Sequence, residues 1–487
     1  MFPASIKVSD LNRKHPEYDI HKFDLDRISM LTSGGHKLTS QLDTVLHSRP
    51  MEPAEMKEYR KNLFSYNNIL GTVNGWYVAK LFEKSPSVDM VDGVENPEMQ
   101  SFLNDSDRSG TPFIDSMRKV ASSILKFKRV FAVIDQPEQK KEYATRAEEL
   151  ADKATAPYMV VYDPRHVINW GRDGFGALQW ILARTDVVSV SGEFPHAPQR
   201  EAHWWYFSGK TQAHYRAVYE NEHSEPELAQ LVFERTVSRF NVVEIEVSDD
   251  HWLASRALLP AIKLLNLENA LDWQLFINAL PILVIKGRID EKPTVNELGY
   301  LLIPEGGDAS YLEQSGAMAD TLRERCQEHL ENCYRLMYVV QQGRSGNATA
   351  AAQSGISKEA DTMPSLHVCS AIGDSLRIGM KKILEIVSSI AGIQNVPDVR
   401  GFMFPTDDVD GSLATLEKLN SLQIPSDTLY TEVEVGAAKE VLGDQPQNIL
   451  DAVEKEIRSG PTRSARIEAE KREQVERFAE SFSQAAA

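Results

Sequence analysis

The sequence predicts an α+β protein, with long helices on either side of a block of strands. Apolar residues recur at helical spacing over residues 54–82 and again from residue 252 onward. Between residues 157 and 247 the pattern changes to short β-branched and aromatic segments. Of the 487 residues, 42% are hydrophobic and 25% are charged. This is the composition of a globular protein, and it excludes a chain that is disordered throughout.

Residues 54–134 are predicted to form the N-terminal helices, a loop and a first strand. The stripe over residues 54–82 indicates one amphipathic helix, and Gly71 or Gly75 is where we expect it to break. A loop, a second amphipathic helix and a strand are expected next, over residues 85–112, 112–127 and 129–134.

The strand block is predicted to form a mostly antiparallel meander of about six strands. Turn signals such as Asp163-Pro164 and Ser208-Gly209 separate its segments. The expected strands cover residues 158–162, 166–170, 177–183, 204–207, 213–219 and 242–247.

Three long helices dominate the second half of the prediction. The first covers residues 252–278, and Pro260 is expected in its first turn because proline disrupts a helix interior. The later segments are a region of strand character at 282–303, helices at 311–341 and 362–390 around a small polar stretch at 343–357, and shorter helices at 412–422 and 428–442.

Charge and cysteine content limit the possible functions. The net charge of −18 argues against a protein that wraps nucleic acid, which needs clustered cations, but not against one that DNA merely passes. Three cysteines in one stretch indicate a reducing compartment rather than a disulfide framework. The longest wholly apolar run, residues 279–285, is far too short to span a bilayer, so no membrane partner is expected.

The sequence contains no signature of a nucleotide-binding or hydrolytic enzyme, so we predict no enzyme activity, no catalytic residue and no cofactor. Cys326, His329 and Cys333 share one helical face, with His367 and Cys369 further along. Zinc would need four converging ligands, and buried cysteines in helix seams explain the pattern more simply, so no metal is predicted. Three other candidates are interpreted structurally: Gly171–Gly176 as a hairpin turn, Asp407, Asp408 and Asp410 as a loop, and His203–Phe207 as a half-buried strand.

The two helices on either side of the 282–303 segment are expected to need partners. A pair of helices cannot bury apolar residues on all sides by itself, so we expect them to pack against copies of the same chain in a ring. The predicted intersubunit residues on the first of these helices are Leu258, Ile262, Leu265, Leu271 and Leu275.

Six segments, in this order, resemble the portal proteins (head–tail connectors) of tailed bacteriophages. None of them is catalytic, and their order carries the resemblance. They are residues 51–86, 126–137 (KFKRVFAVIDQP), 156–170 (APYMVVYDPRHVINW), 259–287, 311–322 (YLEQSGAMADTL) and 347–366.

The resemblance implies a portal fold assembled as a ring, most simply a dodecamer, around a channel for double-stranded DNA. Such a ring sits at one vertex of the virion, forms in the host cytoplasm, and binds the terminase large subunit, the major capsid protein and head–tail adaptor or tail proteins. The implied parts are a wing (1–250), stem helix 1 (251–281), a small β-containing clip (282–310), stem helix 2 (311–342), a tunnel loop (343–361), a wing return helix and connector (362–447) and a helical crown (448–487).

The tunnel loop is where the resemblance places contact with DNA. Its predicted residues are Gly343, Arg344, Ser345, Gly346, Asn347, Gly355 and Lys358, of which Arg344 and Lys358 would lie nearest the DNA. Two alternatives stay open: an intracellular α+β enzyme that uses Cys326 or His329, and a capsid or scaffolding component without a DNA channel.

Overall fold

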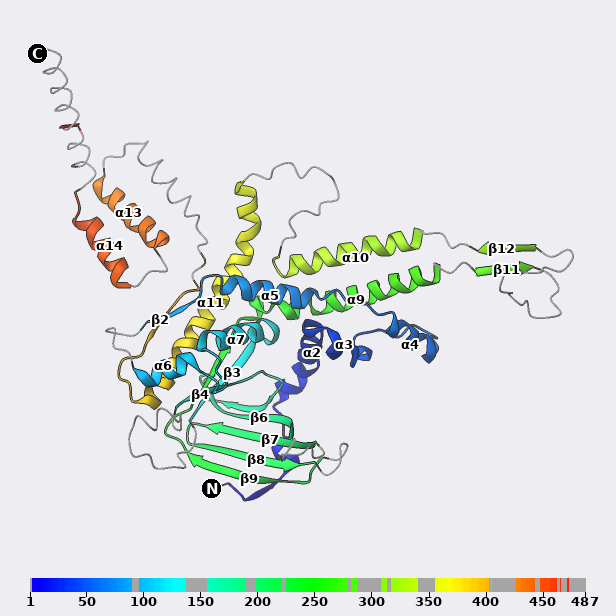
Figure 1. Cartoon of the computed structure of the whole chain (residues 1–487), viewed down its shortest axis with the longest axis horizontal. Helices are drawn as coiled ribbons and strands as arrows, with labels where there is room; N and C mark the ends of the chain where they lie inside the picture. The colour runs from blue at the N-terminus through cyan, green and yellow to red at the C-terminus, as the bar shows by residue number, and fades with distance from the viewer. Residues whose placement is uncertain are drawn as a thin grey trace, which may run out of the picture.

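The computed structural model has a mixed body of helices and sheets from which a long arm projects (Figure 1). This confirms the α+β class. The structure describes residues 2–89, 96–136, 156–189, 198–219, 225–278, 282–286, 308–312, 317–339, 355–402, 404, 426–442, 447–461, 465 and 471–472. Within these ranges no helix is both long enough and apolar enough to cross a membrane.

The N-terminal region is helical, as predicted, but its first long helix breaks at a different place. Residues 54–82 form two helices. The second is capped at its N-terminus by Asn68, whose Oδ1 accepts the Gly71 N–H at 2.8 Å. Gly71 therefore lies inside the second helix. The elements are β1 (Ser5–Lys7), α1 (Val8–Leu11), α2 (Pro16–Ser33), α3 (Gly35–Thr39), η1 (Leu42–Thr44), α4 (Ala54–Asn62), α5 (Ile69–Leu81), β2 (Ser87–Asp89), α6 (Pro97–Asn104) and α7 (Phe113–Phe127).

The strands form two main antiparallel sheets rather than one meander. The six-stranded sheet has the order β1-β9-β8-β7-β6-β5, and the three-stranded sheet has the order β10-β3-β4. The single-meander prediction is wrong because β4 pairs with the preceding strand β3 and not with β5, and because β10 pairs with β3 instead of with β9. The strands are β3 (Arg129–Asp135), β4 (Tyr158–Tyr162), β5 (Val167–Arg172), β6 (Leu178–Ser189), β7 (Gln199–Ser208), β8 (Thr211–Val218), β9 (Leu228–Thr236) and β10 (Val242–Glu246).

Strand β3 separates the two hydrophobic cores of the body. Its side chains alternate between opposite faces of the sheet. Val130, Ala132 and Ile134 join the larger core, which the helices build, whereas Phe131 and Val133 join the smaller core against the six-stranded sheet. The RVFAVI segment is apolar throughout because both of its faces are buried.

The remaining elements correct several predicted boundaries. The first long helix begins at Leu253, so Pro260 lies inside it and not in its first turn. The second begins at Ala317, because residues 308–312 form a strand, and the third begins at Gly355. The elements are η3 (Asp249–His251), α9 (Leu253–Asn278), β11 (Ile282–Lys286), β12 (Asp308–Leu312), α10 (Ala317–Leu336), α11 (Gly355–Ala391), β13 (Asp398–Arg400), α13 (Asp427–Val441) and α14 (Gln447–Ser459).

Candidate functional site

The candidate site is the arm, which we define as α9, β11, β12 and α10. The two helices run side by side away from the body, and the two strands lie at the far end (Figure 1). The strands form an antiparallel ladder in which Ile282 pairs with Leu312 and Lys286 pairs with Asp308. The arm thus places a small β unit far from the cores of the body.

The base of the arm belongs to the larger core of the chain itself. Leu258, Ile262 and Leu265 are only 3%, 5% and 1% exposed, and all three pack in that core. They are therefore already covered within one chain and cannot also face a neighbouring copy. This corrects the expectation that they form an intersubunit contact.

The outer part of the arm keeps apolar side chains at its surface. Leu271 is half-buried against the larger core, whereas Leu275 is 44% exposed. Phe276 and Met318, which the sequence analysis did not single out, are also exposed. Of the five predicted intersubunit residues, Leu271 and Leu275 are the two that stay available for that role.

A buried ion pair fastens the outer part of α9 to α4. The guanidinium of Arg60, which is 3% exposed, donates from Nε to Glu52 Oε1 at 2.6 Å and from Nη2 to Glu52 Oε2 at 2.8 Å. Arg60 Nη1 also donates to Asn269 Oδ1 on α9 at 2.7 Å. These charge-assisted hydrogen bonds to Arg60 hold the pKa of Glu52 at about 2. We call this set of residues the bracket.

Three further hydrogen bonds extend the bracket along α9. Asn266 Nδ2 donates to the Val45 carbonyl, and the His47 N–H donates to Asn266 Oδ1, both at 2.8 Å. One turn beyond Asn269, Asp272 accepts a hydrogen bond from Ser65 Oγ at 2.6 Å. Because Asn266, Asn269 and Asp272 recur every three residues, they lie along one side of the helix.

Near the bracket, burial perturbs a carboxyl group. The desolvation of Glu268 raises its pKa to about 7, and the nearby charge of Asp272 acts in the same direction. The hydrogen bond from the Asn67 backbone acts in the opposite direction. Glu268 therefore titrates near neutral pH, unlike an ordinary glutamate.

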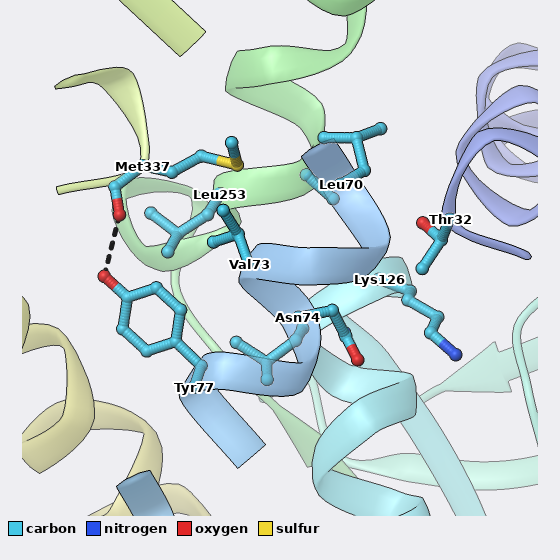
Figure 2. A pocket seen from close by; sticks show the side chains of 10 residues that line it. Thr32, Leu70, Val73, Asn74, Tyr77, Lys126, Leu253 and Met337 are labelled. Atoms are coloured by element: carbon cyan, nitrogen blue, oxygen red, sulfur yellow. Dashed lines mark hydrogen bonds between the residues drawn. The ribbon is translucent and has the colours of Figure 1, made fainter. Parts of the chain in front are cut away.

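A small cavity lies where the arm meets the body. Figure 2 shows Val73 and Tyr77 of α5 facing Leu253 of α9 and Met337, with the Tyr77 hydroxyl donating to the Met337 carbonyl at 2.8 Å. The cavity has a volume of about 20 Å³. That is room for roughly one water molecule, so the cavity is a packing defect rather than a ligand site.

The predicted cysteine and histidine candidates do not converge on a metal. Cys326, Cys333 and Cys369 are all buried in the larger core, and burial raises the pKa of these thiols to about 11, 11 and 12. The thiols are therefore protonated at neutral pH and poor nucleophiles. His367 is exposed, and no group of metal-ligating side chains comes together within the described ranges.

The tunnel-loop residues fall into two groups. Gly343, Arg344, Ser345, Gly346 and Asn347 lie outside the described residues. Gly355 and Lys358 lie in the first turns of α11. The loop predicted for 343–361 is therefore wrong at its C-terminal end, where the helical segment starts earlier than the 362–390 stripe indicated.

The other candidates are structural wherever the structure describes them. Trp204 and Phe207 are buried in β7, and Trp205 stacks on His214 with their ring centroids 3.8 Å apart. Residues 171–176 include the turn between β5 and β6, where Gly176 has a φ of 87°. The three aspartates at 407, 408 and 410 lie outside the described residues.

Sequence reasoning missed the bracket entirely. Arg60 is one of several charged residues interspersed in the helical stripe of residues 54–82, and nothing local distinguishes it from Lys57 or Lys61. Its burial depends on Asn269, which lies 209 residues away in the sequence. The sequence offers no signal for such a contact.

The sequence matches no protein-family model and no curated protein. Three solved structures align with the chain over most of its length. A chain from the virion of a native gene transfer agent (GTA) particle aligns with 12% identity and a TM-score of 0.37, over 86% of this chain and 99% of that chain. A chain from the neck of an empty GTA particle computed with C6 symmetry aligns with 11% identity and a TM-score of 0.37, over 84% and 98%. A chain from the neck of a native GTA particle computed with C12 symmetry aligns with 13% identity and a TM-score of 0.33, over 80% and 95%.

Proposed function

We propose that this chain is a portal subunit: a structural component that forms a ring at one vertex of a phage-like capsid and surrounds double-stranded DNA. The observation that carries the proposal is the arm, in which two long helices run side by side with a short β ladder at their far end. The sequence resemblance predicts this same order: stem helix, clip, stem helix.

The boundaries of the proposed parts follow the observed elements. The stem is α9 and α10, and the clip includes β11 and β12, so the clip extends to Leu312 rather than to residue 310. The wing is the body before η3 together with α11, and α14 belongs to the crown. The tunnel loop, whose helical boundary now lies at Gly355, connects α10 to α11.

The charge of the chain suits a channel that DNA passes through. A protein that neutralises many phosphates holds DNA tightly, because each contact releases counterions. With a net charge of −18 per chain, a ring would repel the DNA backbone except at isolated cations. We assign that role to Arg344, with Lys358 as the second candidate.

Partners follow from the same proposal. The terminase large subunit, the major capsid protein and a head–tail adaptor or tail protein are the expected binding partners. The ring is most simply a dodecamer, in the virion and, during assembly, in the host cytoplasm.

The direct test is the oligomeric state of the purified full-length chain, measured by native mass spectrometry and negative-stain electron microscopy. We expect closed rings with a central hole. We also expect Leu275→Glu to prevent ring closure, since it places a charge on an exposed apolar position of the arm. The matched control is Phe175→Glu, which changes a fully exposed side chain in the β5–β6 turn and should leave the rings intact.

The channel is tested separately by packaging. Arg344→Glu should leave ring assembly unchanged but lower the yield of DNA-filled particles, whereas Arg344→Lys keeps the charge and should package normally. Rings that package DNA equally well with either substitution would remove the assignment of this loop to the channel. Oligomers that lack a central channel would favour a scaffolding component, and monomers would contradict the portal proposal.

A further inference from the structure

A cluster of cations surrounds one buried serine on the body of the molecule, away from the arm. Ser29, in the last part of α2, is 3% exposed, and its Oγ accepts two hydrogen bonds of 2.7 Å. One comes from Lys37 Nζ on α3 and the other from Arg165 Nη1, between β4 and β5. Two positive groups from distant parts of the sequence are thus held side by side.

Lys126 at the end of α7 is the third member of the cluster. It is half-buried, and the positive charges of Lys37 and Arg165 add to burial in lowering its pKa. Figure 2 shows its ammonium end directed away from Leu253 and Tyr77, which line the small cavity beside it. Within the described part of the chain, its Nζ forms no hydrogen bond and no ion pair.

The carboxylates around the cluster do not balance its charge. Asp163 binds the Arg165 guanidinium through two hydrogen bonds, from Nε at 3.1 Å and from Nη2 at 2.7 Å, and also accepts the Arg165 backbone N–H at 2.9 Å. Asp26 is paired with Lys22 one turn away on α2. These groups give four cations against two carboxylates in a protein whose net charge is −18. The excess positive charge lies around Ser29, where Lys37 and Arg165 meet and where the charges of both act on Lys126.

The cluster is also held in place. The Arg165 guanidinium lies over the Phe127 ring, with 4.7 Å between its Cζ and the ring centroid, and the Asp163 carboxylate fixes its orientation. The side chain of Arg165 is only 19% exposed. After these bonds the guanidinium keeps one further N–H on Nη1 and one on Nη2. These two donors, beside two ammonium groups, match a tetrahedral oxyanion, which accepts several charge-assisted hydrogen bonds at once.

We propose that Lys37, Lys126 and Arg165 form a binding site for a phosphate group. Lys126 supplies the unpaired charge, Lys37 a second ammonium, and Arg165 a donor that is already oriented. The bound phosphate relieves the repulsion among the three cations. This site does not depend on ring formation, so it stands or falls independently of the portal proposal.

The test is the thermal unfolding midpoint of the full-length protein in sodium phosphate at constant ionic strength. A ligand that binds only the folded state raises the midpoint, on the order of 2 °C at about tenfold excess over its Kd. Lys126→Met should abolish this rise. Lys119→Met is the matched control, because Lys119 is an exposed lysine on the same helix and outside the cluster. It should respond to phosphate as the wild type does.

Two further measurements make the outcome decisive. Without phosphate, Lys126→Met should unfold at or above the wild-type midpoint, because it removes a repelled cation but keeps the apolar stem. Lys37→Met, a change at an exposed residue, should weaken the response to phosphate. If phosphate raises the midpoint of all variants equally, or of none, the site does not exist.

The source of the phosphate group is settled by a labelled DNA duplex in fluorescence polarisation at low salt. If the ligand is the DNA backbone, Lys126→Met should weaken duplex binding several-fold relative to Lys119→Met, and free phosphate should compete. If both variants bind the duplex with the same affinity, while phosphate raises the unfolding midpoint of Lys119→Met but not of Lys126→Met, the ligand is a free phosphate.

Discussion

The two halves of α9 carry the same kind of apolar spacing but meet different surroundings. In the inner half, residues 253–265, apolar side chains such as Leu258 and Leu265 are fully covered by the chain's own core. In the outer half, residues 266–276, Leu275 and Phe276 reach the surface. An apolar stripe therefore predicts that a helix face will be covered, but not whether the cover comes from the same chain.

The two halves are also held by different forces. The inner half is held by burial of apolar surface, which contributes about 25 cal/mol for each Å² removed from water. The outer half packs more loosely, with Leu271 half-buried, and is also attached to the body through the bracket, in which charges and amides are buried together. Buried ion pairs contribute little net stability when intact, but the loss of one partner is costly. The three predictions that follow test this contrast, from the largest expected effect to the smallest.

The bracket should be the most sensitive point of the outer half. Arg60→Ala leaves the Glu52 carboxylate and the Asn269 amide buried without their partner, so we expect a loss of about 4 kcal/mol in the free energy of unfolding. Urea unfolding measures this change.

The control for the bracket is Lys57→Ala on the same helix, where Lys57 pairs with the exposed Asp43 at 2.6 Å. It should cost no more than about 1 kcal/mol. Equal losses for the two variants would mean that the bracket does not hold the arm.

The inner half should depend mainly on packing. Leu265→Ala removes a side chain that is 1% exposed and leaves a cavity, so we expect it to lower the free energy of unfolding by about 3 kcal/mol. Leu275→Ala, which truncates a 44% exposed side chain, should cost only about 0.5 kcal/mol under conditions that keep the protein monomeric. Similar losses at the two positions would show that the halves do not differ as described.

The smallest expected effect is a pH dependence at Glu268. Its pKa is about 7 in the folded state and 4.5 ordinarily, so the folded state binds more protons between these values, and stability falls as the pH rises through 7. Glu268→Gln should remove this loss and stabilise the protein at pH 8, relative to the wild type, on the order of 1 kcal/mol. The difference between the two proteins should shrink at pH 5, and a constant difference would contradict the assignment.

Local patterns predicted the elements whose surroundings are simple. The helix α7 and the strand β3 follow directly from their amphipathic and fully apolar patterns, because one face of the first and both faces of the second are buried. The break before α5 was misplaced because Gly71 reads as a helix breaker. In the structure Gly71 is required inside the helix, where a Cβ would lie 2.6 Å from the Thr32 carbonyl oxygen.

Long-range pairing explains what the sequence could not predict. Strand β9 was missed because eight of its nine side chains are exposed or half-exposed, which leaves little apolar alternation, and because one of its two partners, β1, lies at the other end of the wing sequence. The division into two sheets depends on β10 pairing with β3, more than a hundred residues earlier. At the candidate site the arm was predicted, but the bracket was not, since it joins α4 to α9 across 209 residues.

The position of the bracket along α9 has a mechanical consequence. A helix of this length spans about 40 Å, and its stiffness makes it a lever. Asn266 and Asn269 fix it just past its midpoint, with the β11–β12 ladder beyond its end. The bracket then acts as the pivot of α9, so a small change in the tilt of the helix at the bracket produces a larger displacement of the β11–β12 ladder. The position and direction of these strands are therefore set by side chains near the middle of the helix.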